Sequence, residues 1–172
     1  MDSQIRGLTM GIRHAKDGQS LVDTQEGALQ EVTALLQRMR ELAVQAGSGV
    51  ATDTDKNYLQ VEMGQLVDEI DAISDSTKFN DQRVLTGATF AFYTDIDVAG
   101  TAVTTVAASA AAATIGITKA NVSIGAGTST NALLQAVITK VDNAIGSIAS
   151  FRANLGAVSN RFDHIIDNLT NV

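Results

Sequence analysis

Long, uninterrupted helical repeats of apolar side chains constrain this fold more than any other feature of the sequence. Proline is absent from the 172 residues, so no residue forces a helix to break. A helix of about 40 residues is about 60 Å long at 1.5 Å per residue. A compact chain of this length has a radius of gyration of only about 15 Å. Two such helices must therefore lie side by side, and we expect an elongated, mainly α-helical rod.

The first predicted helix runs from about Ser3 to Ala46. Its apolar residues recur at alternating steps of three and four in two groups: Ile5, Leu8, Ile12 and Ala15, then Leu29, Val32, Leu36, Met39 and Ala43. Between the groups, Gly18, Gln19 and Gln25 occupy positions on the seam, so the two groups do not share one heptad register. The pattern fits either one helix with a local irregularity or two helices nearly end to end.

Two further helices are predicted from capping residues and apolar seams. The second runs from about Asp53 to Ser76, and Thr52 with Asp55 forms a capping-box pattern at its start. Its seam consists of Leu59, Met63, Leu66, Ile70 and Ile73. The third begins after Thr128, Ser129 and Thr130, any of which could cap it, and runs to the end of the chain.

The segment between the second and third helices is rich in Ala, Thr and Val. Short strands or a hairpin are predicted around Thr89–Val98 and Ala102–Val106, and the alanine run at 110–113 could instead form a helical turn. We therefore predict a discontinuous helical core, residues 1–87 and 128–172, built as an antiparallel bundle of two long helices and one shorter helix. Residues 88–127 are expected to form a small β-hairpin or irregular cap on this rod.

Charge and composition exclude several classes of function. The net charge is −7, and no basic stripe is present that could neutralise nucleic-acid phosphates. The chain has no cysteine, no apolar run long enough to span a membrane, and none of the features of a cleaved signal peptide at its start. The only histidines, His14 and His164, match no metal-binding motif. We interpret them as solvated and expect neither enzymatic activity nor a cofactor.

Several segments resemble the signatures of bacterial flagellins. EGALQEVTALLQRMRELAVQ, at 26–45, is similar to their N-terminal signature, and SQIRGLTMGIRHAKDGQSLV before it looks like the same region. FNDQRVLTG at 79–87 resembles the stretch that closes the N-terminal half. FRANLGAVSNRFDHIIDNL at 151–169 resembles the C-terminal signature. Residues 88–127 match only loosely, in a region where flagellins vary.

The resemblance implies a structural subunit of the extracellular flagellar filament, with other flagellin subunits as its partners. Flagellins are exported unfolded through the flagellar type III apparatus without a cleaved signal peptide. Their extreme terminal segments pair as coiled helices in the inner tube of the filament. Because the chain starts and ends within the conserved regions, we expect those segments to be missing. The chain is then expected to fold, to assemble poorly and to be monomeric in solution.

One strip of the first helix is the candidate interface. Arg38 and Gln45 lie nearly opposite the apolar seam, and Leu42 lies about 100° from its centre. The pattern alone makes Leu42 either an edge contact to a neighbouring helix or an exposed residue. The resemblance implies that the strip packs on adjacent subunits and, in the monomer, is bound by the vertebrate Toll-like receptor for flagellin. The implied interface residues are Gln37, Arg38, Glu41, Leu42 and Gln45, with Glu62 on the second helix.

A second hypothesis is a secreted or cell-surface adhesin that uses the helical core as a scaffold. Residues 88–127 would then bind a polysaccharide or a host molecule, which requires exposed aromatic and polar groups. Phe90, Phe92 and Tyr93 form the only aromatic cluster there, and their alternation predicts that at least one points inward.

Overall fold

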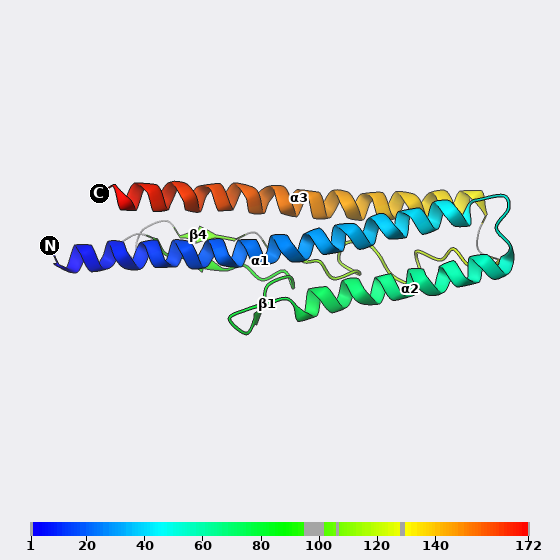
Figure 1. The fold of residues 1–172 in the computed structure, drawn as a ribbon, viewed down its shortest axis with the longest axis horizontal. Coiled ribbons are helices and arrows are strands. Elements are labelled where there is room, and N and C mark those ends of the chain that lie inside the picture. The colour runs from blue at the N-terminus through cyan, green and yellow to red at the C-terminus, as the bar shows by residue number, and fades with distance from the viewer. Residues whose placement is uncertain (1, 95–101, 106, 128–129, 172) are drawn as a thin grey trace.

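The computed structural model describes residues 2–94, 102–105, 107–127 and 130–171. Within that part of the chain, the helices are α1 (Asp2–Ala46), α2 (Asp53–Ser76) and α3 (Asn131–Thr170). α1 and α3 run antiparallel along nearly the whole rod, and α2 packs beside the C-terminal half of α1 (Figure 1). The start of α1 and the end of α3 lie at the same end of the rod. The predicted bundle of two long helices and one shorter helix is confirmed.

Hydrogen bonds at the helix starts explain where α2 and α3 begin. At α2, the Asp55 N–H donates to Thr52 Oγ1 at 3.2 Å, and the Thr52 N–H donates to Asp55 Oδ2 at 2.9 Å. The predicted capping box is therefore present. At α3, Thr130 is the cap, because its hydroxyl accepts from the Leu133 N–H at 3.3 Å. The other candidate caps, residues 128 and 129, lie outside the described residues.

α1 is one continuous helix, and its seam is interrupted where other elements come close. Gln25 is fully buried and donates from Nε2 to the Val84 carbonyl oxygen at 2.6 Å. Gly18 lies against the ring of Phe162 on α3, and a Cβ at this position would approach two ring carbons to 2.8 Å. The polar and small residues on the seam therefore mark close contacts within an unbroken helix.

The first seam group of α1 is less buried than the pattern predicts. Ala15 is fully buried, but Ile5 is 60% exposed, and Leu8 and Ile12 are only partly buried. The reason is visible in the arrangement of the helices, because α2 does not extend along this part of the rod (Figure 1). An apolar repeat in this region therefore meets fewer neighbouring side chains than the same repeat further along α1.

One short strand pair was predicted and is observed. β3 (Ala91–Phe92) pairs antiparallel with β4 (Val103–Thr104). Residues 95–98 and 106, which complete the predicted strands, lie outside the described residues.

A second strand pair was not predicted. β1 (Lys78–Phe79) and β2 (Gln82–Arg83) are joined by Asn80 and Asp81, whose φ angles are 52° and 63°. Two consecutive left-handed residues make the tight turn that suits a two-residue hairpin, and Asn and Asp tolerate this conformation. The Arg83 side chain then pairs with Asp75 at the end of α2 at 2.9 Å.

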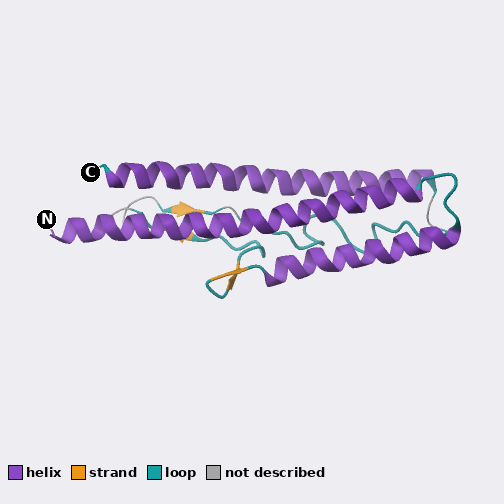
Figure 2. Cartoon of the chain, viewed as in Figure 1, coloured by secondary structure: helices purple, strands orange, loops and turns teal. Residues whose placement is uncertain are grey.

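The described residues of the segment 84–127 run along the side of the rod and do not cover one end of it (Figure 2). Many of their apolar side chains belong to the core: Val84, Leu85, Val103, Ala108, Ala110, Ala112, Ile115, Ile117, Val122 and Ile124 are buried. The Thr114 and Ile115 N–H groups both donate to the Ala111 carbonyl oxygen, at 2.9 and 3.2 Å. Residues 112–116 therefore form a hydrogen-bonded turn that overlaps the alanine run, 110–113, where a helical turn was considered. The segment therefore completes the packing of the helical core.

Polar side chains of α2 hold this segment in place. Asp71 Oδ1 accepts from the Ala112 N–H at 2.8 Å, and Gln60 Oε1 accepts from the Ile124 N–H at 2.6 Å.

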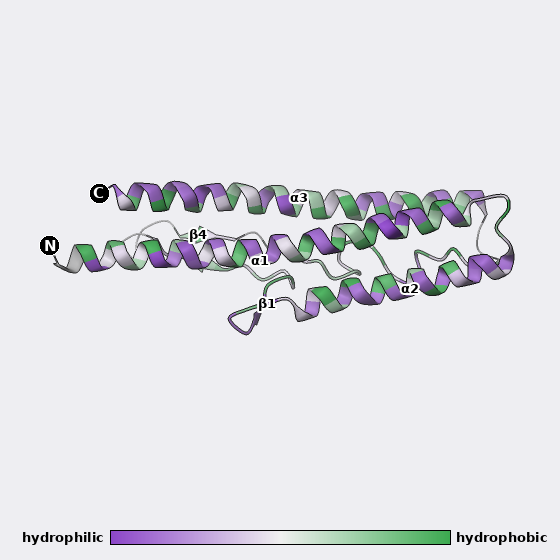
Figure 3. Cartoon of the chain, viewed as in Figure 1, coloured by the Kyte–Doolittle hydropathy of each residue, from purple (hydrophilic) through white to green (hydrophobic). Residues whose placement is uncertain are grey.

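Apolar and polar residues alternate in bands along the helices, as Figure 3 shows. Among the described helices, none has an apolar stretch long enough to cross a membrane.

Candidate interaction surface

Arg38 is at the centre of the predicted interface, at the place where α1 passes α2. Its Nε donates to Glu62 Oε1 on α2 at 2.7 Å, and its Nη1 donates to Glu41 Oε2 at 3.2 Å. The side chains of Arg38, Glu62 and Glu41 are 46%, 40% and 68% exposed. The network thus links two helices while remaining open to a partner.

Both carboxylates stabilise the charged form of Arg38. The hydrogen bonds to Glu62 and then to Glu41 raise the pKa of the guanidinium above its usual value. Arginine is charged in proteins in any case, so the effect of the network is to orient the group. A planar guanidinium with donors still accessible can bind a carboxylate or carbonyl of another protein in fixed geometry.

Gln37 and Gln45 are exposed on α1 as predicted, whereas Leu42 is fully buried. Leu42 was expected beside the main core, either exposed or at an edge contact. Its exposure is 0%, so exposure is wrong, and the side chain belongs to the hydrophobic core. The physical reason is that α1 contacts α3 on one side and α2 on another, which widens its buried arc beyond the seam. Leu42 supports the surface from below and is not accessible in the isolated chain.

Two exposed apolar residues of α2 were missed by sequence reasoning. Tyr58 is 70% exposed and Val61 is 61% exposed, and Tyr58 lies one helical turn before Glu62. The signal was available, because both residues lie away from the seam defined by Leu59 and Met63. Aromatic side chains are enriched at the centres of protein interfaces.

In the described part of the chain, the two histidines and the aromatic cluster do not form a second site like the surface around Arg38. His14 Nδ1 lies 2.8 Å from the Tyr93 carbonyl oxygen, and His164 is exposed. No group of three or more acidic or histidine side chains in the described ranges is placed to hold a metal ion. Phe90 and Phe92 pack against the core, as the alternation predicted, which leaves Tyr93 as the exposed member of that aromatic cluster. The adhesin hypothesis therefore gains no support from the aromatic residues.

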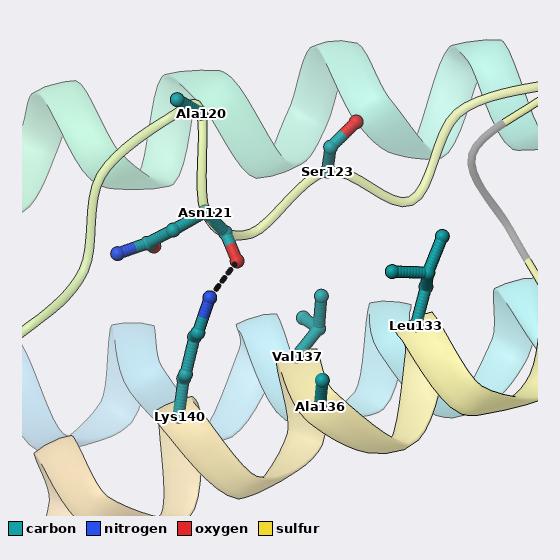
Figure 4. A pocket seen from close by; sticks show the side chains of 7 residues that line it. All are labelled: Ala120, Asn121, Ser123, Leu133, Ala136, Val137 and Lys140. Carbon is teal, nitrogen blue, oxygen red and sulfur yellow. Dashed lines mark hydrogen bonds between the residues drawn. The ribbon is translucent and has the colours of Figure 1, made fainter.

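A shallow hollow between residues 120–123 and the start of α3 is mainly apolar. Leu133, Ala136 and Val137 line it, and Lys140 Nζ donates to the Asn121 carbonyl oxygen at 3.2 Å (Figure 4). The lysine therefore holds residues 120–123 against α3. The hollow is a feature of the packing between this loop and the helix.

Comparison with known families agrees with this architecture. The bacterial flagellin N-terminal helical region matches residues 1–89, more than half of the chain. The chain belongs to the bacterial flagellin family. The bacterial flagellin C-terminal helical region matches residues 138–172, which form most of α3. The two flagellin regions thus correspond to α1 with α2 and to α3, and residues 90–137 between them fall outside both matches.

A solved flagellin structure has the same fold. The crystal structure of Bacillus cereus flagellin superposes with a TM-score of 0.74 at 34% sequence identity, over 91% of this chain and 88% of that one. Flagellin of Bacillus subtilis is 51% identical over 89 residues, which are 51% of this chain and 29% of the relative. The flagellar filament 31.3 kDa core protein of Treponema maltophilum is 47% identical over 87 residues, 51% of this chain and 30% of the relative. The matches span less than a third of the length of these curated relatives.

Proposed function

We propose that this flagellin is a structural subunit of the bacterial flagellar filament, located outside the cell and acting in motility. Membership of the family and the name of the filament core protein of Treponema maltophilum support this role. The subunit contacts other copies through the side of its rod. Like other flagellins, it is exported unfolded through the flagellar type III apparatus without a cleaved signal peptide.

The interface surface in this proposal consists of Gln37, Arg38, Glu41, Gln45 and Glu62, with Leu42 packed beneath. The exposed Arg38–Glu62 ion pair between α1 and α2 is the observation that carries it, because it presents an oriented cation beside carboxylates. In the filament the surface packs on an adjacent subunit. In the free chain it binds the vertebrate Toll-like receptor for flagellin.

Filament assembly is tested by sedimentation after mixing the chain with sheared flagellar filaments as seeds. A second sample contains a chimaera in which the terminal segments of Bacillus subtilis flagellin flank the same 172 residues. We expect the chimaera to pellet as filaments, and the chain alone to remain mostly monomeric in the supernatant. If neither sample pellets with the seeds, the role as a filament subunit is wrong for this core.

Receptor binding is tested with Arg38→Asp and a matched control, Arg40→Asp. Both arginines are on α1 and half exposed, but Arg40 pairs with Asp142 on α3 at 2.8 Å, away from Glu62. We expect Arg38→Asp to weaken binding to the receptor ectodomain at least about tenfold, as for an interface hot spot, and Arg40→Asp to change it little. Equal affinity of Arg38→Asp and the unmodified chain would show that this surface is not the receptor site.

A further inference from the structure

A cleft lies where the strands β1 and β3 both contact α1. It is lined by Asp17 of α1, Phe79 of β1, Asn80 of the following turn and Phe92 of β3, and its volume is about 530 Å³. Ligand sites usually have volumes of about 300–1,000 Å³. Three separate parts of the chain therefore bring two aromatic rings, a carboxylate and an amide together in one cleft of suitable size.

Asp17 supplies the charge of this cleft. Its side chain is exposed and makes no hydrogen bond or ion pair with any described residue. Lys16 is adjacent in sequence, and adjacent residues of a helix do not face each other. Arg13 lies one helical turn earlier, and ion pairs at that spacing on a helix surface are weak. The carboxylate is therefore accessible to a cation from outside the chain.

The register of the β1–β2 hairpin keeps the cations of the hairpin away from the cleft. Lys78 is paired with Arg83 across the hairpin, and Phe79 is paired with Gln82. Successive side chains of a strand point to opposite faces, so the two cations share one face, and Phe79 and Gln82 share the other. On its own face, Arg83 pairs with Asp75 of α2 at 2.9 Å. The face that lines the cleft therefore has an aromatic ring and an amide, and neither cation of the hairpin.

The ring of Phe92 is held in position by the core. It packs edge to face on Phe162, with the ring centroids 5.7 Å apart and the ring planes at 86°. Phe162 is fully buried and lies against Gly18, the residue after Asp17. A ring that is already fixed loses little freedom when a ligand binds to it.

We propose that this cleft binds the guanidinium group of an arginine side chain on a partner protein. A guanidinium is planar, stacks on aromatic faces and pairs with a carboxylate through two parallel hydrogen bonds. An ammonium group suits the cleft less well, because it is a compact and strongly hydrated charge. The net charge of the chain, −7, also favours a basic partner.

The amides beside the rings favour an arginine within a polypeptide over a free cation. Asn80 and Gln82 are both exposed, and each side chain has donors and acceptors. The peptide groups on either side of an arginine have the matching N–H and carbonyl groups. A free guanidinium ion would leave the two amides to water.

The cleft is separate from the surface around Arg38. Asp17 precedes Arg38 by about 30 Å along α1, at 1.5 Å per residue. The proposal therefore does not depend on the filament role or on receptor binding, and its test is independent of theirs.

NMR titration of the isotope-labelled chain with a blocked tripeptide, acetyl-Gly-Arg-Gly-amide, tests the site. We expect saturable shifts of the amide signals of Asp17, Phe79 and Asn80, with a dissociation constant in the millimolar range. The same peptide with citrulline in place of arginine has nearly the same shape and no charge. It should bind at least about tenfold more weakly, because it offers neither a charge-assisted hydrogen bond nor a cation–π contact.

Two substitutions and a matched control locate the bound peptide. Asp17→Asn removes the charge, and Phe79→Leu removes the ring but keeps an apolar side chain. Each should weaken binding at least about threefold. Asp23→Asn removes the same charge from an exposed position further along α1, outside the cleft, and should leave the affinity unchanged. Helical circular dichroism checks that each variant remains folded.

The proposal is overturned if the citrulline peptide binds as tightly as the arginine peptide, or if Asp17→Asn weakens binding no more than Asp23→Asn. Methylguanidinium completes the comparison, and we expect it to bind several-fold more weakly than the tripeptide. Equal affinity for the two would mean that the cleft takes free guanidinium compounds, and would reject an arginine of a partner protein as its ligand.

Discussion

Gly18 shows how a single missing side chain brings α1 and α3 together. A Cβ added there would meet the Phe162 ring, two of whose carbons lie at 2.8 Å, whereas a Cβ added at Gly27 of the same helix has open space. Gly27→Ala should stabilise the protein by about 1 kcal/mol, because alanine favours the helix. Gly18→Ala gains the same propensity but overpacks the core, which costs about 1–3 kcal/mol. We therefore expect it to be about 1–3 kcal/mol less stable than Gly27→Ala.

Urea unfolding followed by circular dichroism measures both variants. The comparison within one helix removes differences in backbone propensity between the two sites. Equal stabilisation by the two alanines would mean that the close approach of Phe162 to Gly18 is wrong.

Individual residues are also where prediction from the sequence was weakest. Gly18 and Gln25 looked like interruptions of a helical seam, because their partners are Phe162 and the Val84 carbonyl, both distant in sequence. Leu42 was placed beside the core because a helical wheel shows angles but not the number of neighbours. In each case the missing information was the identity of the packing partner. By contrast, Arg38 and Gln45 were placed correctly on the surface, because exposure opposite a strong seam depends on the helix alone.

At the scale of elements, the capping box of α2 gives a prediction about pH. Hydrogen bonds from the Thr52 side chain and backbone lower the pKa of Asp55. A pKa that is lower in the folded state means that the ionised carboxylate stabilises the fold above the unfolded pKa of about 3.9. This contribution is lost as the pH falls from there through the folded pKa.

Asp55→Asn tests this pH dependence by chemical denaturation between pH 7 and pH 3. The variant should be less stable than the unmodified chain at pH 7, and the difference should narrow in the acidic range. Asp53→Asn is the control, since Asp53 is in the same first turn but outside the capping box. A stability difference for Asp55→Asn that stays constant with pH would contradict the role of the carboxylate.

Helix positions were predictable because local residues set them, and part of the strand arrangement was not. Thr52 and Asp55 lie next to the start of α2, which they define by their hydrogen bonds. The β1–β2 hairpin was missed even though Asn80 and Asp81 suit its turn, because strands of two residues have no measurable alternation. The course of residues 107–127 along the rod depends on hydrogen bonds to α2, such as that from the Ala112 N–H to Asp71, and no local pattern encodes it.

At the scale of the whole molecule, helix length determines the shape, and packing along the rod maintains it. Ion pairs between helices recur along the contact of α1 with α3, at Glu26–Arg152 and Arg40–Asp142. They are partly or largely exposed, so the buried apolar seams between the helices provide most of the stabilisation. The hydrophobic core therefore extends along the helices and keeps the molecule elongated.

Small-angle scattering of the monomer tests the rod. The 45 residues of α1 extend about 68 Å at 1.5 Å per residue, and a thin rod of that length has a radius of gyration of about 20 Å. A compact chain of 172 residues would give about 15 Å. We expect the larger value, with a pair-distance distribution that has a long tail to about 70 Å. The measurement belongs at low protein concentration, so that the scattering comes from single chains. A value near that of the compact chain would mean that α1 and α3 do not remain extended side by side in solution.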